Sequence, residues 1–317
     1  MQWKIDGPRT VPQAFPYQGS KRALVGQILS LFPEGGIPLL IEPFAGSAAV
    51  SVAARHYGVA QDIAISDVNG PLIELWRMII DAPAELIDVY TAMWHEQQVG
   101  DDPLASAKAY YMEKRREFNQ THDPAILLYL LARCVKAAVR YGKGGDFNQS
   151  ADNRRMGARP ANMQERIMSA SRLMQGAKTS SESYEDPLVN APREALVYMD
   201  PPYQGTSDVP DHRYLTGLQR EVFAETLQHA VDNQVSFIVS YDVVREDKKY
   251  GEALPEELGL THRHVTVGVS SQATLSGRKE MTIESLYISP ALVARLGGED
   301  KIDTLVNVVP EDQPALF

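Results

Sequence analysis

The residues of this chain best suited to chemistry lie at 200–203, where an acid, two prolines and a tyrosine follow an apolar run. The run from Ala195 to Met199 is typical of a short buried strand, and the prolines must end it because they cannot donate to a ladder. Asp200 and Tyr203 would therefore lie on a stiff support at the carboxyl end of a strand, where ligands bind in open α/β sheets. An ordinary strand exit with an incidental acid is the alternative interpretation.

Three other positions suit a ligand. Residues 43–46, Pro-Phe-Ala-Gly, hold one glycine at a strand-to-helix turn, whereas a dinucleotide turn needs three, so a smaller or uncharged nucleoside is favoured. Asp67 ends the next strand, where an acid can accept hydrogen bonds from ribose hydroxyls or can cap the following helix. Lys21 precedes an amphipathic helix and suits an anionic group such as a carboxylate, with an ordinary surface lysine as the alternative.

The elements that must position these residues alternate between strands and helices. Apolar runs predict strands at 38–44, 63–69, 195–199 and 235–242, and helical patterns occupy 45–58, 70–80 and 216–234. This rhythm is that of βαβ units, so we predict an α/β fold with a doubly wound, Rossmann-like sheet. Two late runs, HRHVTVGVS and ESLYISP, predict an antiparallel hairpin at the edge of that sheet.

One long stretch breaks the alternation. Helix-like patterns at 84–98, 103–118, 124–141 and 163–175 surround a polar loop at 141–160, and no strand pattern interrupts them. We therefore expect a discontinuous α/β domain, residues 1–82 and 183–317, and a mainly helical insert, residues 83–182.

Charge is unevenly distributed along the chain. Between Arg133 and Lys178 there are ten basic and three acidic residues, a local charge of +7 within a chain whose net charge is −10, so the remainder carries −17. Such a concentration beside glycine- and asparagine-rich loops favours a surface that contacts phosphates over a merely solvated helix face.

Composition excludes several classes of site. The single cysteine, Cys134, lies in an apolar helical pattern, so we expect it in the core, and neither a disulfide framework nor a thiolate for attack on cytosine C5 is available. His262 and His264 share one face of a strand but have no acid or cysteine at ligand spacing, so no metal is expected. No apolar leader or membrane-length run is present, and we expect a cytoplasmic protein.

Five segments in one order resemble the α-group, Dam-like N6-adenine DNA methyltransferases. They are Tyr17-Gln18-Gly19-Ser20-Lys21, Pro43-Phe44-Ala45-Gly46, Asp67-Val68-Asn69, the stretch RYGKGGDFNQS at 140–150, and Asp200-Pro201-Pro202-Tyr203. The resemblance covers residues 14–290. Two positions depart from the family pattern: Gly142 replaces an asparagine, and Ser183 replaces an acid that contacts the adenine of the cofactor. That contact would then pass to Tyr184 or Glu185.

The resemblance implies S-adenosylmethionine as the cofactor, bound over the carboxyl ends of the strands. Its predicted site consists of Tyr17, Gly19, Ser20, Lys21, Glu42, Pro43, Phe44, Ala45, Gly46, Asp67, Asn69, Tyr184 and Asp200.

The reaction implied is methylation of adenine N6 in double-stranded DNA, on a base flipped out of the helix. The Asp200 carboxylate and the Pro201 carbonyl would accept the two amine hydrogens, Pro202 would stiffen their support, and Tyr203 would stack on the base. The predicted DNA contacts are Lys136, Arg140, Lys143, Asn148, Arg154, Arg155 and Arg159.

Other readings remain open at this point. The same pair of acceptors would support methylation of cytosine N4 or of adenine in RNA, and a non-catalytic DNA-binding protein could retain the fold. The resemblance also allows a cognate restriction endonuclease as a partner and a bacterial or phage origin.

Overall fold

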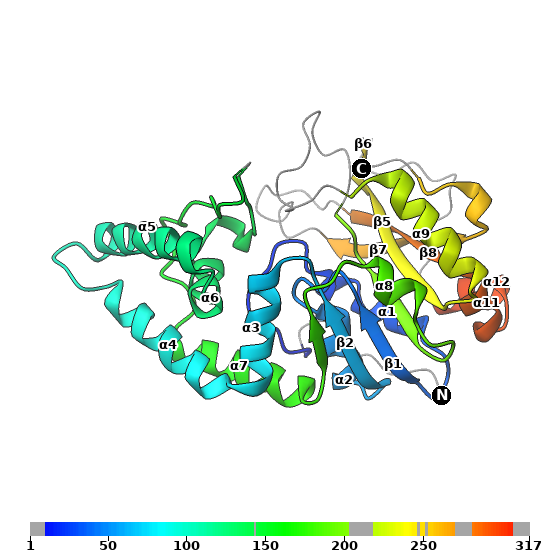
Figure 1. Cartoon of the computed structure of the whole chain (residues 1–317), viewed down its shortest axis with the longest axis horizontal. Helices are drawn as coiled ribbons and strands as arrows, with labels where there is room; N and C mark the ends of the chain where they lie inside the picture. Colours follow the sequence, from blue (N-terminus) through cyan, green and yellow to red (C-terminus); the bar gives the residue numbers. More distant parts are fainter. Residues whose placement is uncertain are drawn as a thin grey trace.

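A mixed sheet with helices on both faces forms the body of the protein (Figure 1). The computed structural model describes residues 10–142, 144–202, 218–245, 248–250, 253–269 and 281–306. Within these residues the strands follow the order β3-β2-β1-β4-β5-β8-β7, with β6 paired to β5. Their bounds are β1 Ile37–Glu42, β2 Ala60–Ser66, β3 Lys178–Ser180, β4 Leu196–Met199, β5 Phe237–Arg245, β6 Lys248–Tyr250, β7 Thr261–Val269 and β8 Met281–Ile288.

Strand direction reverses at β8 along this order and reverses again at β7. The strands from β3 to β5 are parallel to their neighbours, whereas β8 runs antiparallel to both β5 and β7. The prediction of a doubly wound α/β sheet with an antiparallel hairpin at its edge is therefore confirmed.

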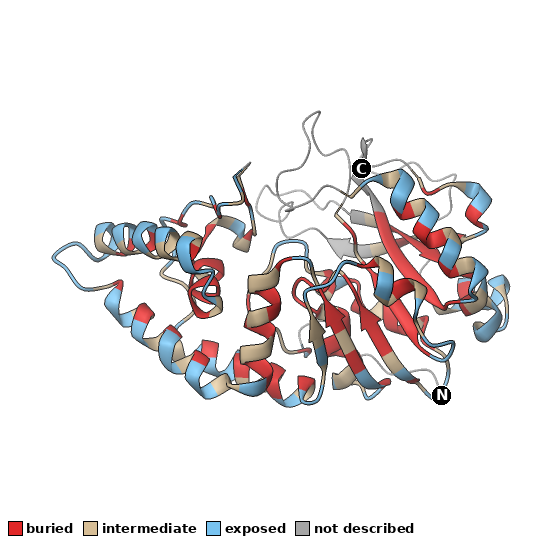
Figure 2. Cartoon of the chain, viewed as in Figure 1, coloured by how far each residue is buried: buried red, intermediate tan, exposed pale blue. Residues whose placement is uncertain are grey.

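Alternate residues of the central strands enter two separate cores. Leu40, Leu196 and Tyr198 face one layer of helices, while Ile41 and Val197 face the other. Figure 2 shows the buried residues continuing along these strands. Burial on both faces requires the nearly unbroken apolar runs seen in the sequence, because successive side chains of a strand point in opposite directions.

The helices divide between the two faces of the sheet. The larger core includes residues of α1, α2, α3, α7, α11 and α12, and the smaller core includes residues of α8 and α9. Their bounds are α1 Val25–Ser30, α2 Ala49–His56, α3 Gly70–Asp81, α7 Pro160–Met174, α8 Glu185–Val189, α9 Arg220–Asp232, α11 Pro290–Leu296 and α12 Glu299–Leu305.

Three further helices extend from one side of the sheet (Figure 1). They are α4 Pro83–Glu96, α5 Pro103–Thr121 and α6 Pro124–Arg133. Helix α6 packs on α3 and α5, and α7, which follows in the chain, packs on α2, α3 and α4. This part of the chain is mainly helical, in keeping with the expected insert, whose limits at 83 and 182 stay a prediction.

Two details of this region correct the sequence reading. The helix predicted over 124–141 ends at Arg133, because Cys134 is extended and pairs with Ala151 across an antiparallel bridge. The absence of any strand between 82 and 182 was also wrong, since β3 adds to the edge of the sheet beside β2. Its three residues, Lys-Thr-Ser, carry no apolar run and so give no strand signal.

We call residues 134–159 the basic loop. A second bridge joins Tyr141 to Phe147 and closes a turn, and the amide of Asn148 donates to the carbonyl of Arg140 at 2.9 Å. The amide of Gln18 donates to the carbonyl of Ala137 at 2.9 Å. The base of the basic loop therefore lies against the amino-terminal segment that precedes α1.

Candidate active site

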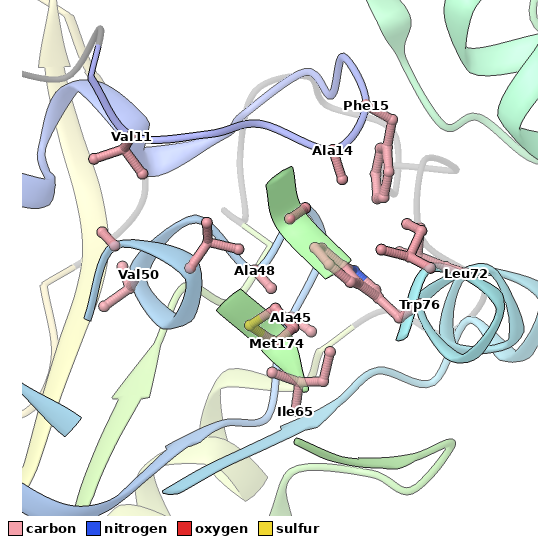
Figure 3. Packing of buried hydrophobic residues seen from close by; sticks show 14 of the residues in the cluster. Val11, Ala14, Phe15, Ala45, Ala48, Val50, Ile65, Leu72, Trp76 and Met174 are labelled. Carbon is pink, nitrogen blue, oxygen red and sulfur yellow. The ribbon is translucent and has the colours of Figure 1, made fainter. Parts of the chain in front are cut away.

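The turn between β1 and α2 has a backbone that only glycine fits well. Gly46 has φ +47°, in the left-handed region, and an added Cβ there would lie 3.0 Å from Cε1 of Tyr17. The indole nitrogen of Trp76 donates to the Gly46 carbonyl at 3.0 Å. Figure 3 shows Trp76 packed near Ala45 and Phe15. The turn is thus held by a hydrogen bond from α3, and the ring of Tyr17 lies against it.

The segment from Tyr17 to Lys21 joins this turn through a second contact. The hydroxyl of Ser47 donates to that of Ser20 at 2.9 Å. Two motifs that lie 27 residues apart in the chain are therefore neighbours, as the sequence resemblance implied.

Asp67 lies at the carboxyl end of β2, beside the same turn. One carboxylate oxygen accepts the amide of Gly46 and the other the amide of Asn69, each at 3.0 Å. Burial raises the pKa of Asp67, and the two backbone hydrogen bonds act in the opposite direction. Asn69, not Asp67, is the N-cap of α3, and no side chain caps that helix end. The carboxylate therefore organises the turn rather than the helix.

An aromatic layer lies under the same edge of the sheet. The rings of Phe44 and Tyr184 stack with centroids 5.1 Å apart, and Phe223 meets both edge-on. Tyr184 is buried while Ser183 is exposed, so the position where the family pattern has an acid faces solvent. Val68, next to Asp67, is an apolar side chain left 45% exposed. Phe44 and Val68 supply apolar surface, and the nearby carboxylate can accept hydrogen bonds from hydroxyl groups. This combination suits a nucleoside.

Asp200 follows β4 directly and forms an ion pair with Lys21 at 3.2 Å. The same ammonium lies 2.9 and 3.2 Å from the two carboxylate oxygens of Glu284 on β8. Burial alone would lower the pKa of Lys21, but the two carboxylates outweigh it and the pKa is raised. The anionic groups expected beside Lys21 are thus, in this structure, two acids of the chain itself. We call Lys21, Asp200 and Glu284 the charge cluster.

Glu42 lies at the end of β1 near the charge cluster. Its carboxylate accepts hydrogen bonds from the amide and hydroxyl of Ser51. Burial raises the pKa of Glu42 to about 7 despite these bonds, and the charge of Asp200 adds to the rise. Glu42 therefore has contacts that fix the start of α2, although the sequence resemblance placed it among cofactor contacts.

Two prolines follow Asp200 at the end of β4. Pro201 is buried and Pro202 is half-buried. Tyr203, the predicted stacking residue, lies outside the described residues, as does Lys143 of the basic loop.

The predicted DNA contacts that the structure describes are all exposed. They are Lys136, Arg140, Asn148, Arg154, Arg155 and Arg159. The buried carboxylate of Asp152 accepts the amide of Arg154 at 2.8 Å and lies 3.3 Å from Nε of Arg155. Arg133 differs from the other bases of this segment, because it is buried and donates to the Asp152 carbonyl. The surface charge therefore belongs to the basic loop rather than to α6.

Three side chains that could take part in chemistry, Cys134, His262 and His264, make structural contacts. Cys134 is buried, and burial raises the pKa of its thiol to about 12, which keeps it neutral. His262 stacks on Tyr287 with centroids 4.3 Å apart, and His264 shares a hydrogen bond with Ser285. No group of three metal-ligating side chains occurs in the described ranges. Of the helices described, none has the length and apolar character that crossing a bilayer requires.

Sequence reasoning missed three residues that shape this region: Tyr141, Asp152 and Glu284. The first two lie in a loop whose fold depends on pairing between distant residues. Glu284 offered a weak signal, because it is an acid at the start of the apolar run ESLYISP, in a strand that the structure buries.

Comparison with known proteins gives a consistent result. The sequence model of the D12 class N6 adenine-specific DNA methyltransferases matches residues 17–269, a range that includes Tyr17 and Asp200 but not Glu284. The chain is 27% identical over 196 residues to the retron Ec67 DNA adenine methylase of Escherichia coli, across 60% of this chain and 63% of the relative, which is less than two thirds of its length.

Two other relatives are similar at the same level. A DNA adenine methylase of Salmonella typhi is 25% identical over 233 residues, which is 71% of this chain and 78% of the relative. The Type II methyltransferase M.MjaIII of Methanocaldococcus jannaschii is 26% identical over 202 residues, which is 59% of this chain and 68% of the relative.

Proposed function

Since this chain belongs to the D12 class N6 adenine-specific DNA methyltransferases, whose reaction is methylation of adenine N6 in DNA, we propose a specific site for that reaction. The methyl donor is S-adenosylmethionine, bound at the carboxyl edge of β1 and β2, and the substrate is an adenine flipped out of double-stranded DNA. One observation carries the proposal: Asp200, the Gly46 turn and Asp67 follow the neighbouring strands β4, β1 and β2 at one edge of the sheet.

The residues around the Gly46 turn would hold the cofactor. Asp67 would accept hydrogen bonds from the ribose hydroxyls, and Phe44 and Val68 would flank the adenine. Tyr17 and Ser20 contact the turn and would approach the methionine end of the cofactor. S-adenosylmethionine supplies an electrophilic methyl group attached to a positively charged sulfur.

Asp200 and Pro201 would prepare the amine for attack. The N6 lone pair of adenine is delocalised into the ring, so the nitrogen is a poor nucleophile. If the Asp200 carboxylate accepts one hydrogen and the Pro201 carbonyl the other, the nitrogen approaches tetrahedral geometry and its lone pair points at the methyl carbon. The new bond forms between nitrogen and carbon as the bond between carbon and sulfur breaks, and the surplus proton leaves after transfer. Asp200 need not be a strong base.

The helical insert, residues 83–182, would bind the DNA. The exposed arginines and lysines of the basic loop lie on a segment that contacts the residues before α1 and after β2. Phosphate contacts from Arg154 and Arg155 would place the duplex over the charge cluster, and Tyr203 would stack on the flipped base. The proposed site of action is the cytoplasm, where cellular DNA lies.

A cognate restriction endonuclease stays a prediction. One relative is named a Type II methyltransferase and two are named DNA adenine methylases, so the names do not favour one arrangement.

Transfer of tritiated methyl groups tests the proposal. The protein is incubated with labelled S-adenosylmethionine and unmethylated duplex DNA, or with RNA in a parallel reaction, and the nucleic acid is digested to nucleosides. We expect the label in N6-methyl-2′-deoxyadenosine from the DNA. Label in N4-methylcytosine, or in RNA alone, would overturn the assignment.

The Asp200→Ala variant tests the catalytic site in the same assay. Because the variant lacks one of two preorganised acceptors, we expect methyl transfer to fall by about 100-fold or more. Binding to duplex DNA should remain close to that of the unchanged protein, since Asp200 is 21% exposed and lies outside the basic loop. Turnover at the normal rate would remove Asp200 from the mechanism.

A further inference from the structure

Glu284 belongs to the charge cluster but has no role in the proposed reaction so far, although it is buried and forms an ion pair with Lys21, which contacts Asp200. Its strand, β8, lies next to β5, which lies next to β4, the strand that Asp200 follows. Glu284 reaches Lys21 across 263 residues of sequence, and its side chain is only 10% exposed. Two carboxylates therefore contact the same ammonium, and Lys21 is the residue that links Glu284 to Asp200.

We propose that Glu284 is a positioning residue for methyl transfer, which competes with Asp200 for Lys21 and so leaves the Asp200 carboxylate directed at the substrate amine as an acceptor. This inference rests on the proposed function, in which Asp200 accepts a hydrogen from N6. Lys21 favours the ionised form of Asp200, and Glu284 accepts two contacts from the same ammonium, so the Asp200 carboxylate is not drawn wholly toward Lys21 and can still accept from the substrate.

Other groups also face Asp200 and belong in any account of its charge. Among the described residues they are Lys21 before α1, Glu42 at the end of β1, Tyr198 on β4 and Glu284 on β8. The hydroxyl of Tyr198 shares a hydrogen bond of 2.9 Å with that of Ser240 and is kept neutral, since burial and then the charge of Asp200 raise its pKa. Lys21 is thus the single cation among these groups.

Lys21 and Glu284 have opposite effects on Asp200. If Glu284 becomes neutral, Lys21 binds Asp200 alone, and the carboxylate is drawn toward the ammonium and weakened as an acceptor. If Lys21 becomes neutral, Asp200 and Glu284 are left as two neighbouring carboxylates, and repulsion favours protonation of one of them. A protonated Asp200 donates a hydrogen instead of accepting one.

Single variants provide the first test. We expect Glu284→Gln to lower kcat by about tenfold, the scale typical of residues that orient a functional carboxylate, with little change in KM for the cofactor or for DNA. Glu284→Asp keeps the charge and should recover part of the loss. Glu299→Gln is the matched control, because Glu299 pairs with Arg263 at the surface of the same hairpin and should leave kcat unchanged.

The pH dependence of kcat distinguishes this role from a structural one. The pH below which activity falls should move down in Glu284→Gln and up in Lys21→Gln, since one variant removes a neighbouring negative charge and the other a positive one. Loss of packing alone would not move the two profiles in opposite directions.

The double variant gives the sharpest result. Glu284→Gln should lower kcat in the normal background but raise it in the Lys21→Gln background, because there it removes the repulsion that protonates Asp200. Circular dichroism and thermal unfolding of each variant check that the fold is intact. Equal kcat for Glu284→Gln and Glu299→Gln, or a double variant slower than Lys21→Gln, would overturn the inference. Normal turnover in Asp200→Ala would instead refute the proposed function.

Discussion

The hydroxyl of Tyr141 donates a hydrogen bond of 3.1 Å to Oδ1 of Asn69, which joins the basic loop to the strand end that carries Asp67. Both side chains are buried, and they lie 72 residues apart in the sequence. The surface proposed for DNA and the residues proposed for the cofactor therefore share a rigid contact. A change in one region has a direct route to the other.

Removal of this hydroxyl should weaken both the fold and the link. In Tyr141→Phe the buried Asn69 oxygen loses its donor, so we expect the free energy of unfolding to fall by about 1–2 kcal/mol in urea titrations. Tyr57→Phe is the control, because the hydrogen bond that its hydroxyl shares with that of Thr10 is exposed and its loss should cost less than about 0.5 kcal/mol. Equal losses in the two variants would show that the Tyr141 bond has no special weight.

The Gly46 turn should not tolerate a side chain. In Gly46→Ala the backbone stays in the left-handed region, which costs about 1–2 kcal/mol, and the new methyl group presses on Tyr17. We expect lower stability together with weaker binding of S-adenosylmethionine in calorimetric titrations. Gly70→Ala is the matched control, since Gly70 has no strained φ and open space around its Cα. An unchanged cofactor affinity in Gly46→Ala would move the cofactor away from this turn.

Neutralising two exposed arginines tests the DNA surface. Arg154→Gln combined with Arg155→Gln should weaken duplex binding and reduce the slope of log K against log salt by about 1.8, if each arginine contacts one phosphate. The control removes the same charge outside the basic loop, with Arg172→Gln in α7 and Lys178→Gln in β3. Fluorescence titrations at several salt concentrations give both slopes. A slope that changes only in the control would place the DNA on a different surface.

Glu42 should make stability depend on pH. Its pKa is raised by burial from 4.5 to about 7 in the folded chain, so between these pH values the unfolded chain loses the proton while the folded chain keeps it. The free energy of unfolding therefore falls as pH rises through this window. The loss due to Glu42 reaches about 3 kcal/mol once this carboxyl is ionised in both the folded and the unfolded chain.

Glu42→Gln removes this dependence and keeps an oxygen that can accept from Ser51. Urea unfolding between pH 4 and pH 8 should show the variant gaining stability relative to the unchanged protein as pH rises. Because the other acids titrate in both proteins, the difference between the two curves reports Glu42 together with its coupling to Asp200. Parallel curves would contradict the raised pKa.

The sequence predicted the parts of the fold that depend on local pattern. Strands β1, β4 and β5 were predicted because their runs are apolar on both faces, and the Gly46 turn was predicted because it follows such a run. Strand β3 was missed because it is short, polar and at the edge of the sheet. The end of α6 at Arg133 was missed because the bridge from Cys134 to Ala151, and not any local breaker, ends the helix.

The candidate site shows the same division. Motif order indicated that Lys21, Asp67 and Asp200 belong together, and the structure brings them to one edge of the sheet. The partner of Lys21 on β8 was not predicted, because nothing in a single sequence connects Glu284 with a lysine 263 residues earlier. Contacts of this kind depend on the order of the strands, which residue periodicity does not specify.

The route of the chain around β3 has a consequence for how such a protein can diversify. The polypeptide leaves the sheet after β2 and returns at β3, the outermost strand beside β2. Of the helices between them, α3 and α7 pack against each other, and α4, α5 and α6 form an excursion at the rim. Lengthening or rewriting that excursion leaves the strand order untouched. In the proposed function this excursion reads the bases, so selection can change which bases are read and keep the strand ends that would hold the cofactor, provided that the contact between Tyr141 and Asn69 is retained.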